Sequence, residues 1–458
     1  MIKRYLAGIA LLTVITMSGC SAKVQETTAD AGTTPAASAP AAEAAADSGT
    51  ASDVIEIEFW HALENQYEET LNRVVGDFNS THDSIVVKPM YIGNYSALNE
   101  AIVSANAANT NLPGVAMANI PYVTGYGAGG LCEDLGPYIQ RDGFEIDDFG
   151  EGLIQAAKYE DVQVALPFLV STEVVYYNRE LMKELGLEMP KTWDEMREVA
   201  RKLTIKEGNS FVQAGLNFNG TFHQNYLLGL NYQLGQDLFE DDKKTATVNN
   251  DAMKAVMQLL VDLYEVDGVG SKDFGAEGAD SFGQGQSAMT IQWGHFNNTL
   301  KTNFPDINFG VFEIPVFEEN PYAYNRYNGE STFGINKNAP ADQQAVAQDI
   351  VKYFLANNDI QKKFNIAMST FPAKKSLAED AEILANPSMA VLADHIDRYI
   401  WPGPMPATME TSLKTAGENV FFNGMSIDDA LAEAEETIHN DMKNSSFESV
   451  ESLYKYAE

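Results

Sequence analysis

Residues 55–87 read IEIEFWHALENQYEETLNRVVGDFNSTHDSIVV, and this stretch sets the fold class. Ile55, Ile57 and Phe59 alternate with glutamates, which predicts a strand with one solvent-facing side. Apolar residues between 67 and 78 then recur three and four positions apart, the spacing of one helix face. A second apolar run begins at Ile85. The order strand, helix, strand requires a crossover and predicts an α/β protein with a mainly parallel sheet.

The composition excludes several classes of protein. The chain has 458 residues, of which 45% are hydrophobic, so large packed cores can form. Lys and Arg number 30 against 65 Asp and Glu, which gives a net charge of −35. Because an acidic field repels phosphate, we expect no nucleic-acid partner and no broad adhesion to anionic lipid.

The N-terminus is expected to be a targeting segment. A basic start is followed by the apolar run of residues 5–17, too short to span a bilayer, and then by two small residues. Residues 1–19 are therefore predicted to be a secretory signal peptide. Residues 20–52 are rich in Ala, Ser and Thr and contain no aromatic residue, so we expect a flexible linker.

The end of this segment, Met17-Ser18-Gly19-Cys20, resembles the lipobox of bacterial lipoproteins, although Met17 replaces the usual Leu. The resemblance implies that Cys20 receives a diacylglycerol and becomes the mature N-terminus. Membrane attachment would then be by lipid alone, at the outer face of the cell membrane. An ordinary secreted protein with a chance cysteine is the alternative interpretation.

The body of the chain lacks motifs of catalysis or metal binding. Residues 125–130 satisfy G-x-G-x-x-G, but Gly136-Pro137 follow too soon for the helix that dinucleotide binding needs. The six histidines show no ligand spacing, so no metal and no cofactor are expected. Further helices are predicted over 251–264, 342–355 and 428–442, and Thr192 with Glu195 forms a capping box.

Five short stretches together resemble family 1 extracellular solute-binding proteins of bacterial ABC importers, the group that binds maltose and glycerol phosphate. The resemblance runs from about residue 54 to 445. It rests on Phe59-Trp60-His61, Gly93-Asn94-Tyr95, Leu166-Pro167-Phe168 with the following STEVVYYN, Pro190 to Glu195, and Gly285 to Thr290.

The resemblance implies a two-lobed periplasmic-binding-protein-like type II fold. Each lobe is expected to be a mainly parallel sheet flanked by helices, and several chain crossings form the hinge. The first lobe is expected to comprise residues 53–165 and about 307–368. The second is expected to comprise about 166–306 and 369–458. Ligand would bind in the cleft between the lobes, which close over it.

The same resemblance implies a set of ligand-contacting residues and no catalytic residue. Aromatic platforms and a rim of polar groups suit the flat C–H faces and hydroxyls of a sugar. The expected contacts are Trp60, His61, Tyr95, Asn119, Ser171, Thr172, Trp293, His295, Gly329, Glu330 and Trp401.

The sequence therefore predicts a monomeric, extracytoplasmic binding protein that is not an enzyme. It would deliver a neutral di- or oligosaccharide to ABC permease subunits that work with an ATPase. In the glycerol-phosphate-binding members of this group an arginine follows the segment that Trp401 resembles, whereas residues 401–414 contain none, although Arg398 is near; the resemblance therefore disfavours a phosphorylated ligand. The alternatives are a binder of glycerol phosphate or another small polar solute, a sugar-sensing subunit, or a secreted glycosidase with a carboxylate pair.

Overall fold

The computed structural model describes residues 54–453, except 65, 119–121, 123–124, 128, 160, 219–222, 277, 331, 402, 404, 446 and 450. The chain divides into two units, residues 1–51 and 52–458, and the description below concerns the second. The predicted signal peptide, Cys20, the linker up to residue 52 and Asn119 lie outside the described residues.

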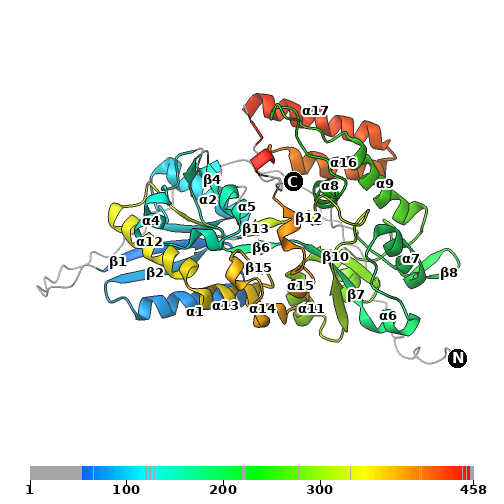
Figure 1. Cartoon of the computed structure of the whole chain (residues 1–458), viewed down its shortest axis with the longest axis horizontal. Coiled ribbons are helices and arrows are strands. Elements are labelled where there is room, and N and C mark those ends of the chain that lie inside the picture. Colours follow the sequence, from blue (N-terminus) through cyan, green and yellow to red (C-terminus); the bar gives the residue numbers. More distant parts are fainter. Residues whose placement is uncertain are drawn as a thin grey trace, which may run out of the picture. The chain divides into compact units, whose positions relative to one another are not determined.

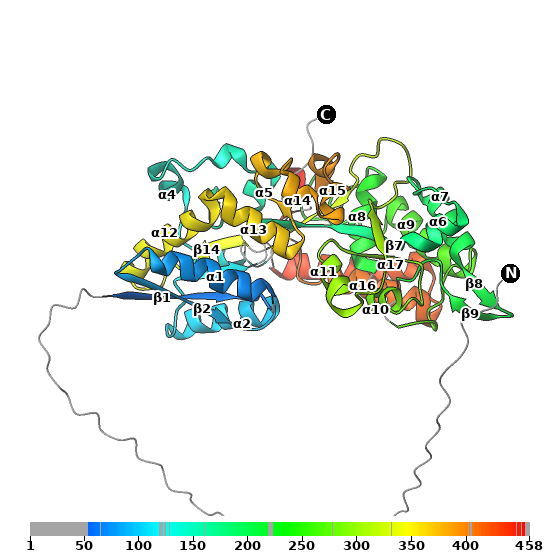
Figure 2. The same ribbon diagram turned by 90° about the horizontal axis from the view of Figure 1, so that it is seen from below.

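The first sheet has four strands in the order β14-β3-β1-β2. β1 (Ile55–His61) pairs in parallel with β2 (Ile85–Tyr91) and with β3 (Val115–Ala118). β14 (Thr332–Ile335) returns from far along the chain and runs antiparallel to β3. The parallel sheet predicted from residues 55–87 is confirmed, and Figures 1 and 2 show it beside its helices.

Helices pack on both faces of this sheet, although Glu56 of β1 and Lys88 of β2 leave part of one face exposed to solvent. Phe59 faces α12 (Ala341–Ala356), where it meets Phe354 edge-on at 5.7 Å between ring centroids. The next residue, Trp60, points to the opposite face and packs with Leu98 of α2 (Tyr95–Ala108). α1 (Gln66–Ser80) and α13 (Asn358–Met368) pack against each other on the α12 face.

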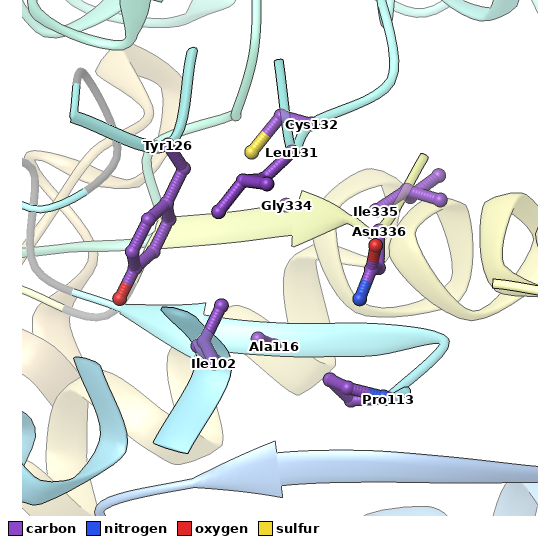
Figure 3. A pocket seen from close by; sticks show the side chains of 9 residues that line it. All are labelled: Ile102, Pro113, Ala116, Tyr126, Leu131, Cys132, Gly334, Ile335 and Asn336. Atoms are coloured by element: carbon purple, nitrogen blue, oxygen red, sulfur yellow. The ribbon is translucent and has the colours of Figure 1, made fainter. Parts of the chain in front are cut away.

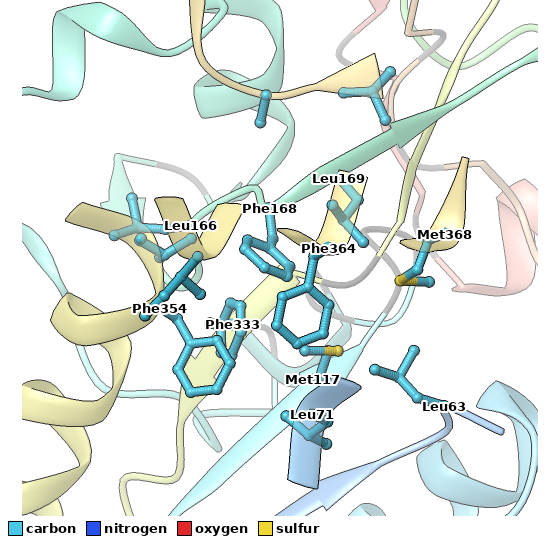
Figure 4. Close-up of a cluster of buried hydrophobic side chains, with 14 of the residues drawn as sticks. Leu63, Leu71, Met117, Leu166, Phe168, Leu169, Phe333, Phe354, Phe364 and Met368 are labelled. Carbon is cyan, nitrogen blue, oxygen red and sulfur yellow. The ribbon is translucent and has the colours of Figure 1, made fainter. Parts of the chain in front are cut away.

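The core of the first lobe is dominated by phenylalanine rings (Figure 4). Phe168, Phe333 and Phe364 contact one another or Phe354 with ring centroids 5.0 to 5.9 Å apart. They come from four distant segments of the chain, so their packing holds the crossover helices and β14 onto the sheet.

Three strands join the two lobes as a small antiparallel sheet. β6 (Leu169–Ser171) lies between β13 (Asn328–Glu330) and β15 (Phe371–Pro372). β6 leads directly into the second lobe, β13 leads back to β14, and β15 follows α13. The predicted hinge of several chain crossings is therefore confirmed.

The second sheet differs from the expectation that each lobe is mainly parallel. It has the order β10-β7-β11, and both β10 (Met289–Trp293) and β11 (Phe309–Phe312) run antiparallel to β7 (Glu173–Asn178). The reason is the hinge: only one residue separates β7 from β6, so β7 leads away from the hinge while its neighbours lead toward it.

Helices enclose this sheet in a second core. α7 (Trp193–Leu203) begins with the predicted capping box, because the Thr192 hydroxyl accepts from the Glu195 N–H and the Glu195 carboxylate accepts from the Thr192 N–H. The other helices of this lobe are α6 (Arg179–Leu185), α8 (His223–Gln233), α9 (Asp251–Glu265), α10 (Gly278–Gly283), α11 (Phe296–Asn303), α16 (Met409–Asn423) and α17 (Ile427–Ser445).

Short elements complete the described part of the chain. The two-stranded sheets are β4 (Lys158–Tyr159) with β5 (Val162–Gln163), β8 (Ile205–Glu207) with β9 (Ser210–Gln213), and β12 (Asn325–Arg326) with β16 (Tyr399–Ile400). The short helices are α4 (Gly136–Arg141), α5 (Glu151–Ala156), α14 (Ala381–Leu384) and α15 (Pro387–Ala390). Single 3-10 turns are η1 (Ile146–Asp148), η2 (Lys375–Leu377), η3 (Ile396–Arg398) and η4 (Glu451–Leu453).

The lobe boundaries predicted near residues 307 and 368 stay predictions. β11 begins just after the first of them and pairs with β7 of the second sheet. Within the described residues, none of the helices has the length and apolar character needed to cross a membrane.

The ring cluster of the first core yields a stability prediction. Replacing Phe354 by Ala removes a fully buried ring that contacts five other aromatic rings, so we expect a loss of about 3–5 kcal/mol in the free energy of unfolding. Urea denaturation of residues 53–458 measures it. Tyr353→Ala, at the partly exposed neighbouring position, is the control with the smaller expected effect; equal losses would contradict the assignment of the core.

Candidate functional site

The candidate site is built where the hinge meets the second sheet. Ser171 ends β6, lies opposite Asn328 of β13 and keeps its buried hydroxyl without a hydrogen-bond partner. Thr172 follows, and its hydroxyl donates to the backbone carbonyl of Arg326 at 2.7 Å. The Thr172 carbonyl accepts from the N–H of Gly294 at 3.0 Å. Two predicted residues, Ser171 and Thr172, thus lie beside the predicted segment that contains Trp293.

Trp293 presents a partly exposed ring in this region. It is the last residue of β10, opposite Glu173 of β7, and its side chain is only partly buried. The guanidinium carbon of Arg326 lies 5.9 Å from the centroid of the indole ring. A flat ring backed by a cation on one side is available as a stacking surface.

Tyr176 holds the segment that presents Trp293 and His295. Its buried hydroxyl donates to the carbonyl of Gly294 at 2.8 Å and accepts from the N–H of Asn297 at 3.0 Å. His295 precedes α11, is partly buried, and desolvation lowers its pKa to about 4. The imidazole is therefore neutral at ordinary pH and available as a hydrogen-bonding group rather than as a charge.

Two residues of opposite charge, Glu173 and Arg326, are buried next to Trp293. Glu173 is 1% exposed and Arg326 of β12 is 4% exposed. Burial raises the pKa of Glu173 to about 7, although the positive charge of Arg326 and the nearby side-chain amides of Asn325 and Asn225 act in the opposite direction. Arg326 donates to the Asn225 side-chain oxygen at 2.6 Å. Glu173 follows Thr172 in sequence and lies opposite Trp293 in the strand pair, and the guanidinium of Arg326 lies near the Trp293 ring.

A second group of predicted residues lies at the carboxyl end of β1 and the start of α2. Trp60 is buried in a small cluster with Leu98 and donates from its ring nitrogen to Glu58 at 2.8 Å. His61 is fully buried; its Nδ1 accepts from the Leu63 N–H at 3.3 Å, and burial lowers its pKa to about 4. Tyr95, the first residue of α2, packs against the same cluster.

The remaining predicted residues divide between the hinge and the interior. Gly329 and Glu330 belong to β13, opposite Val170 and Leu169 of β6. Trp401 is only 2% exposed and packs in the first core, with its ring stacked on that of Tyr327 at 6.5 Å between centroids. The structure brings Ser171, Thr172, Trp293, Gly329 and Glu330 to one region, places Trp401 next to β12 through β16, and holds Trp60, His61 and Tyr95 in the first lobe.

A cavity in the first lobe does not serve as a solute site. It measures about 20 Å³, room for one water, whereas small-molecule sites begin at about 300 Å³. Tyr126 and Cys132 face it across apolar side chains, and burial raises the pKa of the Cys132 thiol to about 12 (Figure 3). Among the described residues, no group of three or more His, Cys, Asp and Glu side chains could hold a metal ion.

Sequence reasoning missed the charge pair and its partners Asn225 and Tyr226. One signal was available, because Glu173 is the only charged residue in LVSTEVVYY, residues 169–177, an otherwise apolar or small-polar run. A charge inside a strand that is buried on both faces needs a partner or a function. The partner Arg326 lies 153 positions further along the chain, which no local pattern reveals.

Two lobes, a three-stranded hinge and polar groups gathered at the hinge define a solute-binding protein. The family described as bacterial extracellular solute-binding protein matches residues 73–391, more than half of the chain, and the chain belongs to this family. Proteins of this family bind a small solute outside the cytoplasm for ABC transporters, whose permease and ATPase subunits carry out transport; they are not enzymes.

Individual relatives are distant. The sn-glycerol-3-phosphate-binding periplasmic protein of Agrobacterium fabrum is 22% identical over 342 residues, 71% of this chain and 76% of that one. The acarbose-binding GacH receptor of Streptomyces glaucescens superposes with a TM-score of 0.72 at 20% identity, over 85% of this chain and 98% of that one. A Mycobacterium tuberculosis UgpB complex with glycerophosphocholine gives 0.73 at 17% identity, over 86% and 99%.

The raised pKa of Glu173 predicts a pH-dependent stability difference. The native state binds this proton more tightly than the unfolded chain does, so the wild type loses stability as pH rises from about 4.5 through 7. Glu173→Gln does not titrate. We expect the variant to gain stability relative to the wild type between about pH 5 and pH 8, by at most about 3 kcal/mol. Denaturant unfolding at both pH values measures it, and a pH-independent difference would contradict the burial of this carboxyl.

Proposed function

We propose that this protein is a surface-anchored lipoprotein that captures a neutral di- or oligosaccharide between its lobes and delivers it to an ABC permease. The observation that carries the proposal is the partly exposed ring of Trp293 at the hinge, beside the unpartnered hydroxyl of Ser171. A sugar needs an aromatic surface for its C–H face and hydrogen-bonding groups for its hydroxyls.

The segment bearing Trp293 is held by hydrogen bonds, which suits a binding platform. Tyr176 and Thr172 hold the backbone of residues 293–297 with three hydrogen bonds from the hinge side. A platform that is fixed before the ligand arrives costs less conformational entropy on binding. His295, neutral at ordinary pH, adds one donor or acceptor beside it.

Glycerol phosphate is the second candidate, and one observation favours it. Arg326 is a cation within reach of the platform, and phosphate recognition commonly uses arginine. The relative in Agrobacterium fabrum is named for sn-glycerol 3-phosphate. Arg398, the other arginine near Trp401, is engaged elsewhere, since it donates to the backbone carbonyl oxygens of Pro321 and Tyr322. The neutral ligand remains our proposal because the Glu173 carboxylate, when ionised, offsets the Arg326 charge.

Closure of the lobes is the functional step. Ligand that touches groups of both lobes does so only when they are closed, so it stabilises that state by its differential affinity. The hinge strands absorb the change through small backbone rotations. Trp60, His61 and Tyr95 at the end of the first sheet are proposed to meet the ligand from the first lobe, together with Asn119, which follows β3 in sequence.

A thermal unfolding panel tests the substrate class. We expect neutral oligosaccharides such as maltotriose to raise the unfolding midpoint of residues 53–458 by a few degrees at about 100 times their dissociation constant, and sn-glycerol 3-phosphate, amino acids and peptides not to. Trp293→Ala should weaken sugar binding about tenfold, because it removes the stacking surface.

The matched control is Phe422→Ala, which removes another exposed aromatic ring far along the chain in α16. Its sugar affinity should equal that of the wild type. A midpoint shift produced by glycerol phosphate alone would overturn the sugar proposal and leave solute binding in place.

Lipid anchoring is tested on the full-length chain in a bacterial host. We expect labelled palmitate to enter the wild type and not Cys20→Ala, because the thiol is the proposed acceptor, and we expect the variant to leave the membrane fraction. Cys132→Ala, which removes a buried thiol, serves as the control and should label normally. Label in Cys20→Ala would contradict the anchor.

A further inference from the structure

Glu173 and Arg326 lie between the hinge strands and the Trp293 platform. Glu173 begins β7 opposite Trp293, and Arg326 ends β12, where its carbonyl accepts from Thr172. Both side chains are almost wholly buried. Burying two charges costs several kcal/mol per ion unless close pairing and hydrogen bonds offset it.

The two charges do not pair as a structural salt bridge does. Their nitrogen and oxygen atoms make no contact within the 4.0 Å of an ion pair, and Glu173 Oε1 and Arg326 Nε lack any hydrogen-bond partner. The Tyr226 hydroxyl beside them is also unpartnered and buried. Burying polar atoms without hydrogen-bond partners lowers stability, so this cluster points to a role other than stability.

Arg326 is placed to act on whatever stacks against Trp293. Its guanidinium lies against the indole ring and is fixed by Asn225 at 2.6 Å. Glu410 approaches the same guanidinium at 3.9 Å, but it is 59% exposed and solvent screens it. Glu173 is therefore the buried charge that balances Arg326 close to the platform.

We propose that Glu173 and Arg326 form a charge filter for the solute: Glu173 cancels the field of Arg326 at the Trp293 platform, so the site selects neutral solutes and rejects phosphorylated ones. The filter rests on the proposed function, since it sets the ligand charge at that same site. It also explains how a chain with an arginine at its platform can favour a neutral sugar.

The size of the effect follows from Coulomb's law. At the effective dielectric of about 20 that suits protein sites, a unit charge about 12 Å from a bound anion changes affinity by about tenfold, and a closer charge changes it by more. Removing the Glu173 charge leaves that of Arg326 uncompensated and favours anions. Removing the Arg326 charge leaves Glu173 and disfavours them.

Isothermal titration calorimetry with two solutes tests the filter. Maltotriose and sn-glycerol 3-phosphate are titrated into the wild type, Glu173→Gln and Arg326→Gln at about pH 8, where Glu173 is mostly charged. We expect Glu173→Gln to raise the affinity for sn-glycerol 3-phosphate relative to that for maltotriose at least fivefold. We expect Arg326→Gln to lower this relative affinity. Circular dichroism confirms that each variant folds, and either variant alone suffices for the comparison.

Glu313→Gln is the matched control, because Glu313 is another carboxyl whose pKa is raised by burial; it is held by His395 and Tyr399, and Arg326 is not among the charges that act on it. It should keep the wild-type ratio. If the wild type binds maltotriose and the folded Glu173 and Arg326 variants keep the wild-type ratio of the two dissociation constants, the filter is overturned and the sugar proposal stands. A wild type that prefers the phosphate would overturn both.

Discussion

Backbone pairing in the three-stranded hinge is the constraint on which the rest of the molecule depends. Val170 of β6 lies between Gly329 of β13 and Phe371 of β15, so three passages of the chain are hydrogen-bonded at one place. This fixes where each segment leaves one lobe and enters the other. It also explains the antiparallel second sheet, because β7 must run away from the hinge that its neighbours approach. Short strands with few hydrogen bonds can rotate about one another while the cores on either side stay packed.

The candidate site is a consequence of that geometry. Strand ends that converge on a hinge bring Ser171, Thr172 and Gly329 together without any local sequence signal linking them. The same convergence places β12 against the platform, and with it the Arg326 guanidinium. Polar atoms left unsatisfied in this region are tolerated because the ring clusters of both lobes supply the stability. A binding protein can therefore concentrate costly polar groups at its hinge.

Local sequence patterns predicted helices and strands, but they did not predict how distant strands pair. The alternation at Ile55 to Phe59 and the helix after it gave the parallel sheet, and Thr192 with Glu195 gave a helix start. The direction of β10 and β11 depends on which strand enters the second lobe from the hinge, and the pattern of residues within either strand does not predict this. Trp401 was expected at the cleft because it lies in a segment that resembles a cleft segment of the family; its ring is buried in the first core against Tyr327, and its contact with a ligand stays a prediction. Glu173 was visible as a charge in an apolar run, but its partner was not.

Closure of the two lobes around a neutral sugar is most directly observed by small-angle X-ray scattering. Residues 53–458 are measured alone and with a saturating concentration of an oligosaccharide that raises the thermal midpoint. If the ligand joins groups from both lobes, the radius of gyration decreases when the sugar is bound and does not change with a sugar that fails to bind. An unchanged radius of gyration in the presence of bound sugar would contradict capture between the lobes and would place the ligand on one lobe alone.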